Sequence, residues 1–83
     1  LKIKEIMKAT VYGTPRCSWC DRVTKMLGEN EIEVEKIDVS ESKENLKLMK
    51  VAAGKSVSTV PQVIIDGKFV GGYTEVERFI NRL

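Results

Sequence analysis

The chain has 83 residues, of which 42% are hydrophobic and 31% are charged. This length leaves room for one domain, and the composition is that of an ordinary globular protein rather than a disordered chain. The formal net charge of +2 is too small to predict a nucleic-acid partner. No apolar run approaches the roughly 20 residues that span a bilayer, so no membrane partner is expected. Residues 1–83 are expected to form a single domain, with residues 1–7 either as an N-terminal extension or as residues added to the natural sequence.

The first predicted elements are a strand over residues 9–12, a helix that starts at Cys17 and a second strand over residues 32–39. Breaker residues end the first strand. The helix has apolar residues at helical spacing and ends near Gly28. The second strand is expected to change register near Lys36.

The remaining elements are a helix, a hairpin and a final helix. Ser40 is the expected N-cap of a helix that stops at Gly54. Two short strands, residues 62–65 and 68–70, flank Asp66-Gly67, which is typical of a two-residue hairpin turn. The apolar face of the last helix is expected to consist of Val76, Phe79, Ile80 and Leu83.

The predicted order is β-α-β-α-β-β-α, which corresponds to an α/β fold with a mixed four-stranded sheet flanked by three helices. The first β-α-β unit must be a parallel, right-handed crossover, whereas the later hairpin is antiparallel. Both cysteines fall at the carboxyl end of the first strand, where open α/β sheets place their chemistry. This end of the sheet is therefore the expected active site.

Cys17 and Cys20 are the only cysteines, and the chain has no histidine. A disulfide across so short a loop stabilises a fold by only about 2 kcal/mol, and secreted scaffolds of this size usually carry more bridges. A zinc site needs four ligands, and two cysteines supply only half of them, so no metal site is expected. The spacing therefore predicts a redox-active pair in a cytoplasmic protein.

The start of a helix favours an anionic sulfur at Cys17, because unpaired N–H groups and the helix dipole attract negative charge. Arg16 adds a positive charge next to it. Such surroundings lower a thiol pKa from about 8.5 to between about 3.5 and 7.5. Cys17 is thus the predicted nucleophile, and Cys20, one turn further and facing the core, is the predicted resolving thiol.

From Val11 to Phe79 the chain resembles a glutaredoxin, a member of the thioredoxin-fold family. The segments that carry the resemblance are Cys17-Ser18-Trp19-Cys20, Thr59-Val60-Pro61-Gln62 and Gly71-Gly72-Tyr73-Thr74-Glu75. The resemblance implies a thioredoxin fold and a monomeric enzyme. It also implies that glutathione is the reductant for protein disulfides and glutathione mixed disulfides.

The resemblance further implies a glutathione site. The residue matching Pro61 is cis in the family, and the main chain of Val60 then pairs with the cysteinyl part of glutathione. Thr74 and nearby N–H groups are expected to hold the γ-glutamyl carboxylate, with Glu75 at the amine. Without the resemblance, Pro61 is equally typical of a strand entry, and Thr74 and Glu75 of helix capping. The expected set is Arg16, Trp19, Thr59, Val60, Pro61, Gly72, Tyr73, Thr74 and Glu75.

One departure from the family pattern concerns the glycine carboxylate of glutathione. Thr14 stands where many glutaredoxins have Lys or Arg. Arg16, Lys50 or Lys55 is therefore expected to supply the positive charge instead.

A second departure lies within the motif, where Ser18 and Trp19 replace the common Pro and Tyr. Some relatives with Ser at this place bind a [2Fe–2S] cluster between two subunits, with glutathione as the remaining ligands. A cluster carrier is thus one alternative function. Another is a thioredoxin-reductase-dependent redoxin that donates electrons to ribonucleotide reductase, although such proteins usually lack the Gly-Gly-Tyr-Thr-Glu segment.

Overall fold

The computed structural model describes residues 6–83 and has the predicted order of elements. Residues 1–5 of the predicted N-terminal extension lie outside the described residues. The elements are β1 (Lys8–Gly13), α1 (Ser18–Glu29), β2 (Glu33–Asp38), α2 (Lys43–Ala53), β3 (Gln62–Ile65), β4 (Lys68–Gly71) and α3 (Tyr73–Asn81).

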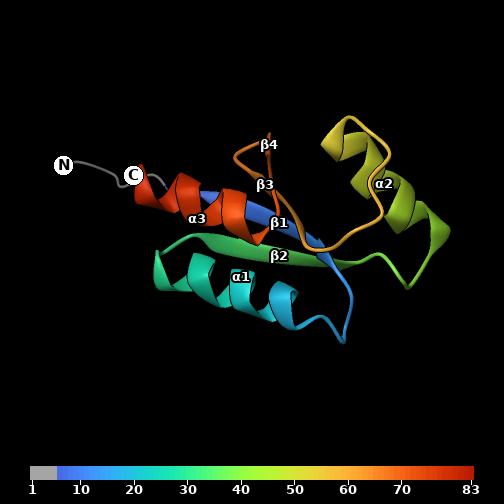
Figure 1. The fold of residues 1–83 in the computed structure, drawn as a ribbon, viewed down its shortest axis with the longest axis horizontal. Coiled ribbons are helices and arrows are strands. Elements are labelled where there is room, and N and C mark those ends of the chain that lie inside the picture. The colour runs from blue at the N-terminus through green and yellow to red at the C-terminus, as the bar shows by residue number, and fades with distance from the viewer. Residues whose placement is uncertain (1–5) are drawn as a thin grey trace.

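The strands form one sheet in the order β2-β1-β3-β4. β1 pairs parallel to β2 and antiparallel to β3, and β3 pairs antiparallel to β4. This mixed sheet confirms the predicted α/β fold. Because β1 lies inside the sheet, the segment that follows it emerges at the middle of one end, where β3 also begins (Figure 1).

The sheet separates two hydrophobic clusters. One cluster contains the fully buried Val23 and Leu27 of α1 and Val76 of α3. The other contains Met49 of α2, packed with Tyr12 of β1. α1 and α3 therefore cover one face and α2 the other, and Figure 1 shows α2 lying apart from the other two helices.

β2 runs without the predicted register break. All of its six residues pair in step with β1. Val34 packs into the cluster under α1 and α3, whereas Ile37 packs into the cluster under α2. Successive strand residues face opposite sides of a sheet. Because helices cover both sides here, apolar residues can switch from one face of β2 to the other without any irregularity in the strand. The prediction of a break near Lys36 was wrong.

The N-cap of α2 is Ser42 rather than the predicted Ser40. Ser42 Oγ accepts a hydrogen bond from the Asn45 N–H at 3.0 Å. Ser40 instead donates its hydroxyl and its N–H to Asp38 Oδ1, at 2.6 and 2.8 Å. The Asp38 carboxylate therefore holds Ser40 in the turn that precedes α2, and α2 begins after Ser42 instead.

The hairpin and the last helix follow the prediction except at the C-terminus. Asp66 and Gly67 both have positive φ, 49° and 80°, as a tight hairpin turn requires. In α3, Val76 is buried and Phe79 packs against the same core cluster. Leu83 lies beyond the end of α3 and is 68% exposed, so its predicted place on the buried face was wrong.

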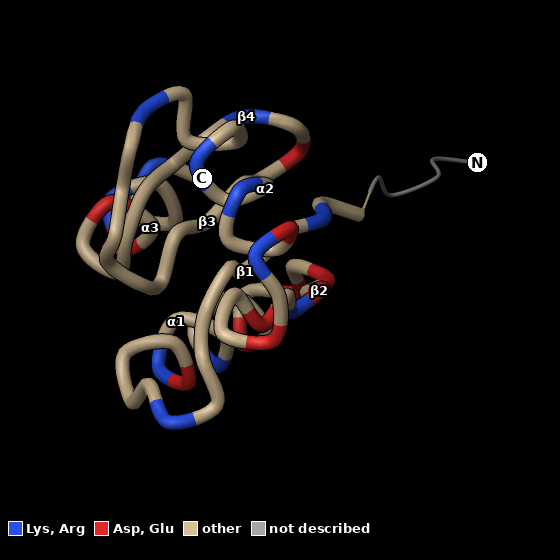
Figure 2. Tube along the Cα trace, turned by 90° about the vertical axis from the view of Figure 1, so that its right-hand side faces the viewer, with Lys and Arg blue, Asp and Glu red and all other residues tan. Residues whose placement is uncertain are grey.

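Charged residues of both signs occur together over the end of the molecule seen in Figure 2. Asp21 of α1 and Lys36 of β2 form an exposed ion pair, with 4.0 Å between Lys36 Nζ and Asp21 Oδ1. Such exposed pairs contribute little to stability. Within residues 6–83, no helix is long and apolar enough to cross a membrane.

Candidate active site

The two cysteines lie at the start of α1. Cys17 is its N-cap, and Cys17 Sγ accepts a hydrogen bond from the Cys20 N–H at 3.1 Å. The first N–H groups of a helix have no partner within the helix. This donor is therefore placed to stabilise a thiolate at Cys17 when the pair is reduced.

The pair is joined as a disulfide, with 5.1 Å between the Cα atoms of Cys17 and Cys20. Cys17 is partly exposed, whereas Cys20 is only 2% exposed. A substrate sulfur can therefore reach Cys17 but not Cys20. The predicted difference in exposure between the two thiols is confirmed.

The segment before β3 approaches Cys17 from the other side. The Val60–Pro61 peptide bond is cis, as the resemblance implied. The carbonyl oxygen of Val60 lies 3.9 Å from Cys17 Sγ. Among the described residues, no main-chain hydrogen bond uses the N–H or the carbonyl of Val60. Both groups are thus available to an extended peptide bound beside Cys17.

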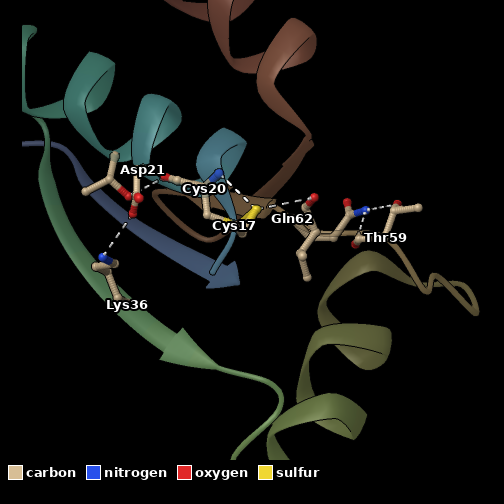
Figure 3. The surroundings of a disulfide bond; sticks show 8 residues. Cys17, Cys20, Asp21, Lys36, Thr59 and Gln62 are labelled. Atoms are coloured by element: carbon tan, nitrogen blue, oxygen red, sulfur yellow. Dashed lines mark hydrogen bonds and ion pairs between the residues drawn. A yellow bond between two sulfur atoms is a disulfide. The ribbon is translucent and has the colours of Figure 1, made fainter. Parts of the chain in front are cut away.

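Gln62 holds this segment in place. It is the one buried polar residue in the described part of the chain, at 8% exposed. Its side-chain amide donates to the carbonyl of Thr59 at 3.0 Å and to Thr59 Oγ1 at 3.2 Å. Buried polar groups need such partners, so Gln62 ties the loop to the first residue of β3. Figure 3 shows this pair on one side of the cysteines and Asp21 with Lys36 on the other.

A groove of about 480 Å³ lies between this segment, α1 and the start of α3. Of the basic candidates for the glycine carboxylate, Lys55 lines this groove, whereas Lys50 does not. Arg16 and Thr74 are exposed and lie outside its lining. The predicted site residues that line it are Trp19, Thr59, Val60, Pro61, Gly72, Tyr73 and Glu75.

One wall of the groove is aromatic. The rings of Trp19 and Tyr73 are 5.1 Å apart at 60°, and Trp19 remains 49% exposed. The guanidinium of Arg22 lies 4.7 Å from the centre of the Trp19 ring, a cation–π contact. Arg22 was absent from the predicted site, although its i, i+3 spacing from Trp19 places both on one helix face.

The start of α3 forms another wall of the groove. The N–H of Gly72, the N-cap, donates to Glu75 Oε1 at 2.8 Å, so Glu75 serves as a capping residue. Gly71 has φ 125°, and a Cβ there would lie 2.9 Å from Glu75 Oε1. Glycine is therefore needed at residue 71 both for its backbone conformation and for space.

Asp38 ends β2 near the cysteines. The hydroxyl and the N–H of Ser40 donate to its carboxylate and hold the pKa of Asp38 below its usual 3.8. Hydrogen bonds to the charged form of an acid have this effect. Asp38 is therefore ionised at neutral pH.

The comparison with known proteins decides the family. The Glutaredoxin family model matches residues 9–70. The chain belongs to the glutaredoxin family. Glutaredoxin 1 of Escherichia coli K12 is 27% identical over 79 residues, which cover 89% of this chain and 93% of that protein. An uncharacterized monothiol glutaredoxin of Caenorhabditis elegans is 38% identical over 74 residues, 84% of this chain but 49% of the nematode protein.

Solved glutaredoxin structures share the fold. The crystal structure of glutaredoxin 1 from Francisella tularensis, complexed with cacodylate, superposes with a TM-score of 0.74. It is 25% identical and covers 92% of this chain and 94% of its own. The thioredoxin fold implied by the resemblance is thereby confirmed. Family membership and a cysteine pair at disulfide distance together indicate a thiol–disulfide oxidoreductase.

Proposed function

We propose that this glutaredoxin uses glutathione to reduce protein disulfides and glutathione mixed disulfides. The observation that carries the proposal is the 3.9 Å between Cys17 Sγ and the carbonyl oxygen of Val60. A tripeptide joined to Cys17 through its own cysteine brings its main chain against Val60. The N–H and carbonyl of Val60, which make no main-chain hydrogen bond among the described residues, then pair with that main chain in the manner of a short β-strand.

The groove suits glutathione in size and charge. Its volume of about 480 Å³ lies within the roughly 300–1,000 Å³ of small-ligand sites. Glutathione carries a carboxylate at each end. The N-terminal N–H groups of α3 are proposed to hold the γ-glutamyl carboxylate. Thr74, which is exposed at the same helix end but outside the groove lining, is proposed to assist them. Lys55 is proposed to hold the glycine carboxylate, because among Arg16, Lys50 and Lys55 it alone lines the groove.

Reduction of a glutathione mixed disulfide needs only Cys17. The Cys17 thiolate attacks the glutathione sulfur and a Cys17–glutathione disulfide forms. The substrate–glutathione bond breaks, and the substrate thiolate leaves and takes up a proton. The thiolate of a second glutathione then attacks the bound glutathione sulfur. Oxidised glutathione forms, and Cys17 leaves as a thiolate, which its helix position favours.

Reduction of a protein disulfide also uses Cys20. Cys17 attacks one substrate sulfur and expels the other as a thiolate. Cys20 loses its proton and attacks Cys17, which breaks the mixed disulfide, releases the second substrate thiolate and forms the Cys17–Cys20 disulfide. Two glutathione molecules then restore the dithiol and leave as oxidised glutathione.

The cluster carrier has less support from the residues present. A [2Fe–2S] cluster takes four ligands, and within residues 6–83 no group of three or more His, Cys, Asp or Glu side chains is placed to hold a metal. A cluster would therefore need a second copy of the chain and glutathione. Visible absorbance together with a dimeric mass after anaerobic reconstitution with iron and sulfide would support the carrier; colourless monomer supports the enzyme.

The pairing with Val60 is tested on a stable complex. The Cys20→Ser variant, loaded with glutathione at Cys17, should show a large NMR shift and slowed hydrogen exchange at the amide of Val60. The same variant loaded with 2-mercaptoethanol is the control, since that adduct has no peptide main chain. Equal effects of the two adducts at Val60 would contradict the proposed binding mode.

A further inference from the structure

We propose that Gly13 is a positioning residue for the resolving cysteine. The space left by its missing side chain lets the Cys20 sulfur reach Cys17, and so helps to set the equilibrium between the dithiol and the disulfide. The proposal rests on the redox activity of the pair and not on glutathione as the reductant.

The contact between Gly13 and Cys20 is close. A Cβ added to Gly13 would lie 2.7 Å from Cys20 Sγ and 3.2 Å from Cys20 Cβ. Non-bonded atoms of this size prefer roughly 3.5–4.0 Å. At Gly28 in α1, by contrast, an added Cβ meets nothing within 4 Å. Alanine therefore fits at residue 28 but forces a displacement at residue 13.

The main chain on the Gly13 side is held in place. Gly13 is the last residue of β1 and pairs with Asp38 of β2. Its carbonyl also accepts a hydrogen bond from the Val39 N–H at 2.9 Å. A movement of the Gly13 main chain away from Cys20 would weaken its pairing with Asp38 and its hydrogen bond with Val39.

The main chain on the Cys20 side is held as well. The carbonyl of Cys20 accepts a hydrogen bond from Thr24 Oγ1 at 2.8 Å. α1 is anchored in the core by Val23 and Leu27, both fully buried. The atom that yields to a new methyl group at residue 13 is therefore the Cys20 sulfur.

Glycine is not needed at residue 13 for its backbone. The glycines with positive φ are Gly54, Gly67 and Gly71, and Gly13 is not among them. An alanine can adopt the conformation of residue 13 without backbone strain. The reason for glycine is the space beside Cys20 Sγ.

The two redox states respond differently to a methyl group here. On oxidation the two thiols lose two electrons and two protons, and the S–S bond fixes Cys20 Sγ next to Cys17. In the dithiol the sulfur is free to rotate away, and a cavity of about 270 Å³ borders both Gly13 and Cys20. The Gly13→Ala change therefore penalises the disulfide more than the dithiol and raises the reduction potential.

The test is a redox titration in mixtures of reduced and oxidised dithiothreitol, which avoids any dependence on glutathione. Alkylation and mass spectrometry give the fraction of disulfide. Gly13→Ala should make the pair about tenfold easier to reduce, which is about 30 mV for a two-electron couple. Gly28→Ala, the matched control, should match the wild type. An unchanged equilibrium in Gly13→Ala would overturn the proposal.

A second measurement covers the case in which Gly13→Ala folds poorly. Cys20→Ala removes the sulfur that the new methyl group meets. The loss of melting temperature caused by Gly13→Ala should be at least halved in the Cys20→Ala background. An equal loss in both backgrounds, or failure of the double variant to fold, would show a merely structural role and overturn the proposal.

Discussion

Cys17 Sγ lies 3.9 Å from the carbonyl oxygen of Val60, although 43 positions separate the two residues. The antiparallel pairing of β1 with β3 brings them together, because Tyr12 stands opposite Gln62 at the end of the two strands. The chain leaves β1 towards Cys17 and enters β3 from Val60 at the same end of the sheet. One strand pair thus positions both Cys17, the proposed nucleophile, and the main chain that is proposed to receive its substrate.

The different exposure of the two thiols predicts different effects of their removal. Cys17→Ser should lower turnover of a glutathionylated peptide by about 10³-fold or more, because no other exposed thiol can attack. Cys20→Ser should retain much of that activity but lose the reduction of a protein disulfide. Steady-state assays with both substrates check this. Equal losses for the two variants on the glutathionylated peptide would favour a mechanism that always needs both thiols.

The N-cap position of Cys17 predicts an acidic thiol. In the reduced protein the Cys20 N–H and the helix dipole favour the thiolate, so the pKa of Cys17 should lie below that of a free thiol. The rate of alkylation by iodoacetamide as a function of pH measures it, with Cys20→Ser used so that only Cys17 reacts. A pKa near the 8.5 of a free thiol would contradict the role of Cys17 as an easily expelled sulfur.

The fold was predictable because its signals are local. Apolar periodicity and the Asp66-Gly67 turn specify the elements and their order, and right-handed crossover then leaves few topologies. The errors arose where tertiary contacts decide. Ser40 and Ser42 are both suitable N-caps, and only the position of the Asp38 carboxylate selects between them. The supposed break near Lys36 disappears because both faces of β2 are covered.

The residues of the site likewise fall into those that the sequence predicts and those that only the structure reveals. The cysteines and the residues around Val60 stand in contiguous motifs, so sequence alone points to them. Lys55 was one of three basic candidates, and only the path of the loop after α2 places it in the groove. The contact between Arg22 and Trp19 depends on the orientation of the Trp19 ring. The contact between Gly13 and Cys20 depends on how α1 packs against the end of β1. The contacts of Lys55 and Gly13 leave no signature in a single sequence, whereas the i, i+3 spacing of Trp19 and Arg22 indicates only that both lie on one helix face.

The position of Lys55 predicts a substrate-binding effect. Lys55→Gln should raise the KM for a glutathionylated peptide about threefold to fivefold with little change in kcat, as expected for an exposed ion pair of up to about 1 kcal/mol. Lys50→Gln, which removes a neighbouring charge outside the groove, is the control. The assignment of Lys55 would be wrong if the Lys50 variant alone raised KM.

The hydrogen bonds of Ser40 predict a pH-dependent contribution to stability. The pKa of Asp38 is lowered in the folded state, so its contribution is present above the unfolded pKa of about 3.9 and is lost as the pH falls through the lower folded value. Ser40→Ala should raise the Asp38 pKa towards 3.8 and cost more stability at pH 7 than at pH 3.

NMR titration of the Asp38 carboxyl carbon and urea unfolding at pH 7 and pH 3 check this prediction. Ser56→Ala, at an exposed position in the loop after α2, is the control. An Asp38 pKa that stays unchanged in the Ser40 variant would show that the Ser40 hydroxyl is not the cause of the shift.

The most direct test of the proposed function is a coupled assay on one disulfide substrate with two alternative reducing systems. One system supplies glutathione with glutathione reductase and NADPH, and the other supplies thioredoxin reductase with NADPH. We predict sustained turnover with glutathione and only background oxidation of NADPH with thioredoxin reductase. Turnover with thioredoxin reductase alone, and none with glutathione, would contradict glutathione as the reductant.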